Sequence, residues 1–273
     1  VGGSSEPTYV VRAALALFAA GYHVARLNQR GAGESWRIAP SLYHGGLSDD
    51  VTRVVRAYAE DPRVSSVAVF GFSLGGNLVL KTAGEWGSAP PPKMGAVVSV
   101  SAPTNLSVVS THLEGRSTAP YRLYVLQRLV ATARAWAAKQ RAAGAPVPFD
   151  AARLSRTGTL RGYDNQVVAP MHGFPDAEAY YGYASSGTYL PRIQVPTLAV
   201  HANDDPMVPG WSVRDALAAR SPAVELAWSN HGGHVGWIGD LAETGWLRTW
   251  AVDQGVRFLD RVLGSPAPPS RAV

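Results

Sequence analysis

A serine between two glycines stands where a predicted strand gives way to a predicted helix. Residues 71–75 read G-F-S-L-G; a run typical of a buried strand, 66–72, leads into them, and a helical pattern follows over 75–84. A serine nucleophile requires a sharp, strained turn with small flanking residues, and free N–H groups at the start of the helix point at the reacting carbonyl. The pattern predicts Ser73 as a nucleophile, with the Leu74 amide in an oxyanion hole.

Two later loops supply the side chains that such a serine needs. A hydroxyl is a weak nucleophile until a base takes its proton, and that base needs an orienting carboxylate. The sequence HANDDPMVP, 201–209, begins in a predicted strand, 197–202, and HGGH, 231–234, lies beyond another, 224–228. Serine, acid and histidine thus follow successive strands, which predicts a catalytic triad.

Each loop offers two choices. We favour Asp205 over Asp204 because Asp205 directly precedes a Pro-x-Val-Pro turn, and we expect Asp204 to accept hydrogen bonds from the loop backbone. We favour His234 over His231 because two glycines before His234 allow the loop to approach Ser73, which leaves His231 a structural role. A metal site from these side chains is the alternative, but H-x-x-H on a loop is a weak signal. We therefore expect neither a metal nor a cofactor.

The segments around these loops alternate between strand-like and helix-like, which indicates a mostly parallel sheet flanked by helices. The predicted strands span 22–28, 66–72, 96–101, 197–202 and 224–228. Between 104 and 191 no clear strand occurs, and one long helix is predicted at about 121–143. We interpret 104–191 as a helical cap inserted into an α/β core of residues 1–103 and 192–264, with a loose tail, 265–273.

The cap and two glycine-bounded loops supply candidates for a substrate pocket. Leu126 lies on an apolar face of the long predicted helix, available above the sheet, although that face is nearly as well suited to packing on it. His44 follows Tyr43 and precedes two glycines, and His172 precedes Gly173. Either histidine could line the pocket, but we favour packing of its own loop as its role.

Composition excludes several other classes of function. The chain has 273 residues, 46% hydrophobic and 16% charged, which is ordinary for a globular protein. Its net charge of +5 is scattered without a basic run, which argues against nucleic-acid binding, and no apolar stretch is long enough for a transmembrane helix. Cysteine is absent, which removes disulfides, thiolate metal sites and cysteine nucleophiles. A cytoplasmic location is our expectation.

Five motifs together resemble a known family: NQRG with GES (28–35), YHGG (43–46), GFSLGGN (71–77), APMHGFPDAEAYY (169–181) and HGGHVG (231–236). They are similar to the α/β-hydrolase group of YheT-type hydrolases and medium-chain fatty-acid ethyl ester synthase/esterases. The resemblance implies an α/β-hydrolase fold with Ser73, Asp205 and His234 as triad. It also implies action on short- to medium-chain esters, a small molecule or a lipid. The alternatives are acyl transfer to an alcohol and a non-catalytic binding protein of the same fold.

The start of the chain departs from that family. Its members carry a strand and a His-Gly pair immediately before the position matched by Val1. The resemblance therefore implies that a strand is missing between 23–28 and 66–71, and it places the amide near Val1 in the oxyanion hole beside Leu74. Without that strand we expect unpaired backbone groups, low stability and little activity from residues 1–273 alone.

Overall fold

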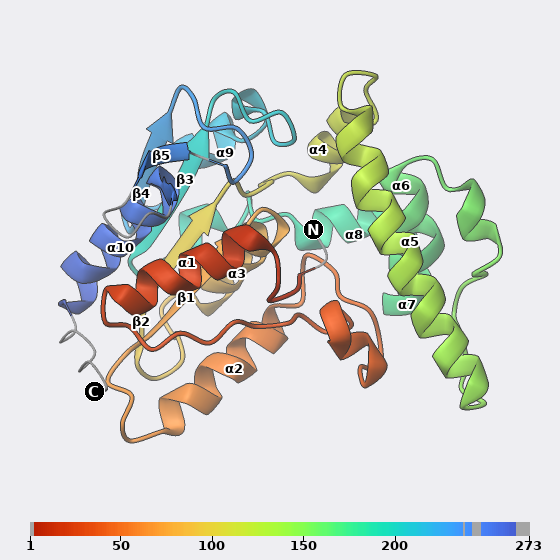
Figure 1. Ribbon diagram of the computed structural model, residues 1–273, viewed down its shortest axis with the longest axis horizontal. Coiled ribbons are helices and arrows are strands. Elements are labelled where there is room, and N and C mark those ends of the chain that lie inside the picture. The colour runs from red at the N-terminus through yellow and green to blue at the C-terminus, as the bar shows by residue number, and fades with distance from the viewer. Residues whose placement is uncertain (1–2, 237, 242–246, 266–273) are drawn as a thin grey trace.

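Four parallel strands form the central sheet of the computed structural model, which describes residues 3–236, 238–241 and 247–265. The strands lie in the order β1-β2-β3-β4 (Figure 1). Their bounds are Val67–Phe72, Met94–Val100, Thr197–Ala202 and Val224–Ser229. Each lies within two residues of a predicted strand, which is the usual disagreement between ways of placing strand ends. A two-stranded antiparallel sheet, β5 (Ile238–Leu241) and β6 (Leu247–Thr249), follows.

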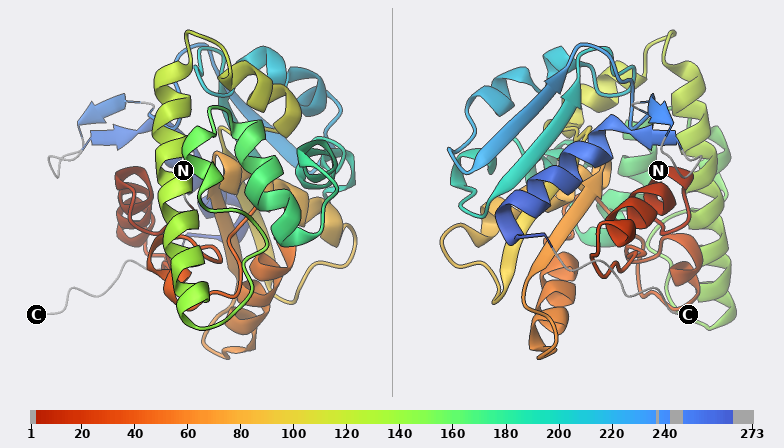
Figure 2. Two further views of the ribbon diagram at one scale, coloured as in Figure 1. Left: turned by 90° about the vertical axis from the view of Figure 1, so that its right-hand side faces the viewer. Right: turned by 60° about the vertical axis from the view of Figure 1, so that its left-hand side comes forward.

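Helices cover both faces of this sheet (Figure 2). On one face lie α2 (Ser48–Glu60) and α3 (Leu74–Trp86), and on the other α1 (Thr8–Ala19) and α10 (Trp250–Leu263). In β2, Val98 and Val100 pack toward α10 whereas Val97 packs toward α3, as the two-residue repeat of a strand requires. Burial on both faces explains why the strands read as continuous apolar runs. A short helix, α9 (Arg214–Ala218), precedes β4.

The chain between β2 and β3 forms a layer of helices beside the sheet, at the right of Figure 1. Its elements are α4 (Leu106–Leu113), α5 (Ala119–Ala142), α6 (Leu160–Tyr163), a π-helix (Asp164–Val168), α7 (Ala169–His172) and α8 (Ala177–Ala184). The long predicted helix is α5, with Pro120 in its first turn and Gly144, at a φ of 67°, just past its end. No helix within the described ranges is both long and apolar enough to cross a membrane.

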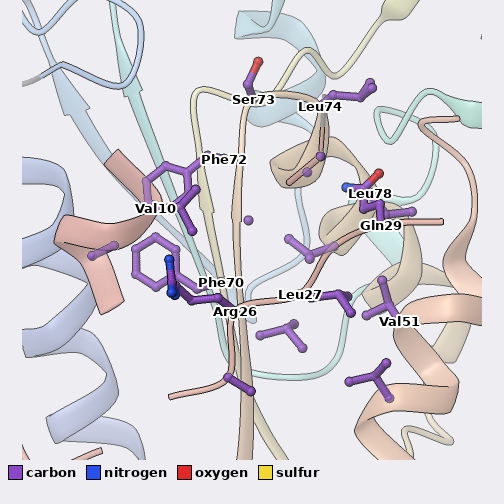
Figure 3. A pocket seen from close by; sticks show the side chains of 18 of the residues that line it. Val10, Arg26, Leu27, Gln29, Val51, Phe70, Phe72, Ser73, Leu74 and Leu78 are labelled. Atoms are coloured by element: carbon purple, nitrogen blue, oxygen red, sulfur yellow. The ribbon is translucent and has the colours of Figure 1, made fainter. Parts of the chain in front are cut away.

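One predicted strand is absent from the described sheet. Residues 22–28 are not assigned to a strand; near their end the Gln29 amide donates to Gly3 O (2.9 Å) and the Asn28 side chain accepts from Ser5 N (2.7 Å). In the described sheet β1 pairs with β2 alone. A cavity of about 1240 Å³ is lined by both residues 21–27 and β1 (Figure 3). Segment 22–28 therefore has no pairing with β1 in the described sheet, and without paired neighbours it is not a strand.

Candidate active site

Ser73 stands on a strained turn between β1 and α3 (Figure 3). Its φ of 51° and ψ of −122° are sparsely populated for a residue with a side chain, a conformation that persists only where the surroundings impose it. A Cβ on Gly71 would lie 2.3 Å from Gly75 O, so position 71 requires glycine. Because α3 begins at Leu74, the Leu74 N–H has no acceptor four residues earlier within the helix.

Ser73, His234 and Asp205 form a continuous hydrogen-bonded series. His234 Nε2 lies 2.9 Å from Ser73 Oγ, and His234 Nδ1 lies 2.8 Å from Asp205 Oδ2. The Asp205 side chain is fully buried, and its other oxygen accepts from the backbone N–H groups of Met207 and Val208, both at 2.9 Å. An ionised carboxylate only accepts, so His234 carries its proton on Nδ1 and presents a lone pair at Nε2 to the serine hydroxyl.

The neighbouring aspartate and histidine form a separate pair at the surface. His231 Nδ1 lies 3.3 Å from Asp204 Oδ2, and the two side chains are 91% and 43% exposed. The other Asp204 oxygen accepts from Gly233 N at 2.9 Å, the backbone bonding that the sequence analysis assigned to it. That bond, followed by the His231 side chain, lowers the pKa of Asp204. The structure thus brings Asp205 and His234 to the serine and leaves the alternative residues outside.

His201 closes the loop that carries Asp205. Its Nε2 donates to Val208 O at 2.9 Å, and the ring is buried beside Trp228. Burial is the main cause of its lowered pKa, so the ring stays neutral and keeps this bond near neutral pH. The sequence alone predicted no role for His201, although it lies near the end of β3, just before the loop that carries Asp205.

Asn77 joins the serine turn to two other loops. It lies on α3 one turn after Ser73 and is fully buried. Its amide donates to Gly45 O (3.1 Å) and Ala184 O (2.8 Å), and its oxygen accepts from Ser186 N (2.8 Å). Asn77 belongs to the motif GFSLGGN, but the sequence alone predicted no function for it. A polar residue four positions after the serine, in an otherwise mostly apolar helix, was the signal for it.

His44 and His172 hold the 42–46 loop against the neighbouring helices. His44 Nδ1 accepts from Gly46 N (3.1 Å), His172 Nε2 donates to Leu42 O (2.9 Å), and the ring centroids lie 4.4 Å apart. Burial, then the nearby His172, Lys81 and Arg30, lowers the pKa of His44 to about 3, so its ring is neutral. His44 also contributes to the cavity wall, whereas His172 packs behind it.

Leu126, expected in the pocket, packs instead into the core of the helical layer. Val125 and Leu129 of the same helix line the cavity. Successive helix residues are turned by about 100°, so the identity of the cavity-facing residue depends on how α5 is rotated against its neighbours. Val1, expected near the oxyanion hole, lies outside the described residues. Within the described ranges no group of three or more His, Cys, Asp or Glu side chains is placed to hold a metal ion.

Residues 2–240 match the α/β hydrolase fold family. YheT of Escherichia coli (strain K12) is 34% identical over 80% of this chain and 63% of that protein. The monoacylglycerol lipase of Saccharomyces cerevisiae is 31% identical over 85% and 51%. A solved structure of the Pyrococcus furiosus esterase Pf2001 shares the fold, with a TM-score of 0.60, 17% identity, and 96% and 78% of the two chains covered. The chain thus spans about half to two thirds of the length of these curated relatives. It belongs to the α/β hydrolase fold family, as the motif resemblance predicted.

Proposed function

We propose that this protein hydrolyses carboxylic esters with Ser73 as nucleophile. The observation that carries the proposal is the Asp205–His234–Ser73 series, which ends on a strained turn in the wall of a large cavity. Strained backbone of this kind persists at functional sites because the surrounding fold enforces it. A binding protein of the same fold needs neither the strained serine nor a buried carboxylate behind the histidine.

The reaction follows from the direction of the hydrogen bonds. Ser73 Oγ attacks the ester carbonyl carbon while His234 Nε2 takes the hydroxyl proton, and the Leu74 N–H donates to the developing oxyanion. His234 then protonates the departing alcohol, which leaves an acyl group on Ser73. Water then attacks the acyl carbon while His234 Nε2 takes its proton, and His234 returns that proton to Ser73 Oγ as the acyl–oxygen bond breaks and the carboxylic acid leaves. Asp205 keeps the proton on Nδ1 and stabilises the imidazolium at each step.

The cavity favours an ester with an apolar acyl chain. Its wall beside the site includes Val125, Leu129 and Leu106, and a similar protein is named a monoacylglycerol lipase. We therefore propose short- to medium-chain esters, from small molecules or lipids, as the substrate class. Acyl transfer to an alcohol uses the same acyl-enzyme and differs only in the final acceptor.

The test combines a fluorophosphonate probe with p-nitrophenyl esters from acetyl to palmitoyl. The full-length protein with Ser73 intact should be labelled and should hydrolyse part of the series. Ser73→Ala should abolish labelling and lower turnover by a factor of about 10³ or more, with an unchanged melting temperature. Ser117→Ala, at an exposed loop position, is the matched control and should behave as the unchanged protein. A folded protein that neither reacts nor turns over contradicts the proposal. Product analysis with added ethanol separates hydrolysis from acyl transfer.

A further inference from the structure

Three polar side chains from separate helical segments meet in the wall of the cavity that contains Ser73. The Tyr181 hydroxyl, on α8, donates to Asp164 Oδ2 at 2.6 Å and lies 3.0 Å from Ser110 Oγ of α4. All three residues line the cavity. Around them the helical layer supplies apolar side chains: Leu106, Val109, Leu113, Val125, Leu129 and Leu160. The trio thus lies in a mainly apolar wall that also includes the Tyr163 and Tyr180 side chains.

The Asp164 carboxyl has no cation of its own among the described ion pairs. The nearby Arg161 pairs with Glu178, and its guanidinium also donates to Ser107 O (3.2 Å) and Thr111 Oγ1 (2.9 Å). Burial in apolar surroundings disfavours a charged carboxylate and raises the pKa of Asp164 to about 7, although the Tyr181 hydrogen bond and the nearby Arg161 act in the opposite direction. Near neutral pH the group is therefore present in both forms, able to accept a hydrogen bond and, when protonated, to donate one.

The local backbone is unusual at the same position. Asp164 opens the π-helical turn Asp164–Val168 between α6 and α7. Such turns insert an extra residue into a helix and occur frequently at functional sites. Holding Tyr181 does not require a carboxyl group, because an amide oxygen would accept the same hydrogen bond without the desolvation penalty of a charge. The proposed hydrolysis does not use Asp164 either.

We propose that Asp164, supported by Tyr181 and Ser110, binds a free hydroxyl group of the substrate. The cavity then selects hydroxyl-bearing esters over plain alkyl esters of the same length. This inference rests on the proposed ester hydrolysis and assigns a specificity-determining site within its cavity. The hydroxyl belongs either to the alcohol part, as in a monoacylglycerol, or to the acyl chain, as in a hydroxy fatty-acid ester. Both present the same donor and acceptor to the carboxyl group.

The experiment compares kcat/KM for three esters: 1-monolauroylglycerol, propyl laurate and methyl 12-hydroxydodecanoate. Asp164→Asn keeps the side-chain volume and an acceptor for Tyr181 but cannot ionise. We expect one hydroxyl-bearing ester to lose about tenfold more kcat/KM than propyl laurate, chiefly through KM, because hydrogen bonds to charged groups are the stronger ones. Which ester loses more identifies the source of the hydroxyl. Asp176→Asn, which alters another carboxyl of the same layer that caps α8, is the control and should leave the ratio unchanged.

Equal losses on all three esters, accompanied by a lower melting temperature, would show that Asp164 only holds the helices together and would overturn the inference. No loss on any ester would overturn it as well. If Asp164→Asn does not fold, Tyr181→Phe serves in its place, because it removes the hydroxyl that orients the carboxyl group and should give a smaller loss of the same selectivity. An unchanged protein that cleaves none of the esters contradicts the proposed function itself, which is a distinct result.

Discussion

Two aspartate–histidine pairs lie side by side in this molecule, built from the same two loops. In one, Asp205 and His234 are 0% and 10% exposed; in the other, Asp204 and His231 are 43% and 91% exposed. The buried pair lies at 2.8 Å and the surface pair at 3.3 Å. Only the buried pair continues to a third group, the Ser73 hydroxyl. Residue type and proximity along the chain therefore do not distinguish the two pairs, whereas burial and direction do.

Burial changes what a carboxylate can do for a histidine. Water and salt screen an exposed ion pair, so it contributes little and orients its partner weakly. Asp205 is removed from water, and two backbone N–H groups fix one of its oxygens, which leaves the other aimed at His234. A fixed carboxylate in a medium of low dielectric constant both selects the tautomer and stabilises the imidazolium. We therefore expect substitutions in the buried pair to lower turnover far more than substitutions in the surface pair.

The largest expected difference concerns the histidines. His234→Ala removes the proposed base and should lower p-nitrophenyl ester turnover by a factor of about 10⁴ or more. His231→Ala removes an exposed ring and should change turnover by less than about twofold. Steady-state kinetics of the two variants, with melting temperatures to show that both are folded, makes the measurement. A His231 variant as impaired as the His234 variant would remove the functional distinction between the pairs.

The aspartates should differ almost as much. Asp205→Asn keeps the shape of the side chain, but its amide can donate to Nδ1 and stabilise the wrong tautomer, a change that costs roughly 10⁴ in a serine protease. Asp204→Asn should leave turnover within about threefold, because Asp204 contacts only the surface histidine and the loop backbone. The two kcat values at one pH are compared. Greater damage from the Asp204 variant would reverse the assignment of the orienting acid.

The sequence was sufficient for the parts of the site that follow local patterns. Buried strands have continuous apolar runs and the candidate loops follow them, so order and turn chemistry predicted Ser73, Asp205 and His234, which lie within hydrogen-bond distance in the structure. Asn77 and the Asp164–Tyr181 bond were missed because their partners come from other elements: Asn77 contacts Gly45, 32 positions away, and Ser186, 109 away. Pairing at that range depends on tertiary packing, for which a single sequence contains no periodic signal.

Segment 22–28 and Leu126 were also predicted wrongly because their placement depends on tertiary packing. The composition of 22–28 suits a strand, but a strand exists only through its neighbours, and in the described residues the cavity separates this segment from β1. For Leu126 the helix was predicted well, whereas its rotation was not, since apolar residues occur on both the core side and the cavity side of α5. Local propensity predicts an element, and only packing decides which of its faces meets the site.

The smallest expected effect concerns Asp204 and stability as a function of pH. The Gly233 N–H, and secondarily His231, hold the pKa of Asp204 below its usual range. A carboxyl whose pKa is lower in the folded than in the unfolded state stabilises the fold above the unfolded value, about 3.9, and this contribution disappears as pH falls through the folded value. Asp204→Asn should therefore melt about 1 °C below the unchanged protein at pH 7, because an exposed pair contributes little, and the gap should close toward pH 3. Melting curves of both proteins at pH 7, 5 and 3 provide the measurement. A gap that widens on acidification would show that the ionised form of Asp204 does not stabilise the fold, and that the two pairs differ in more than burial.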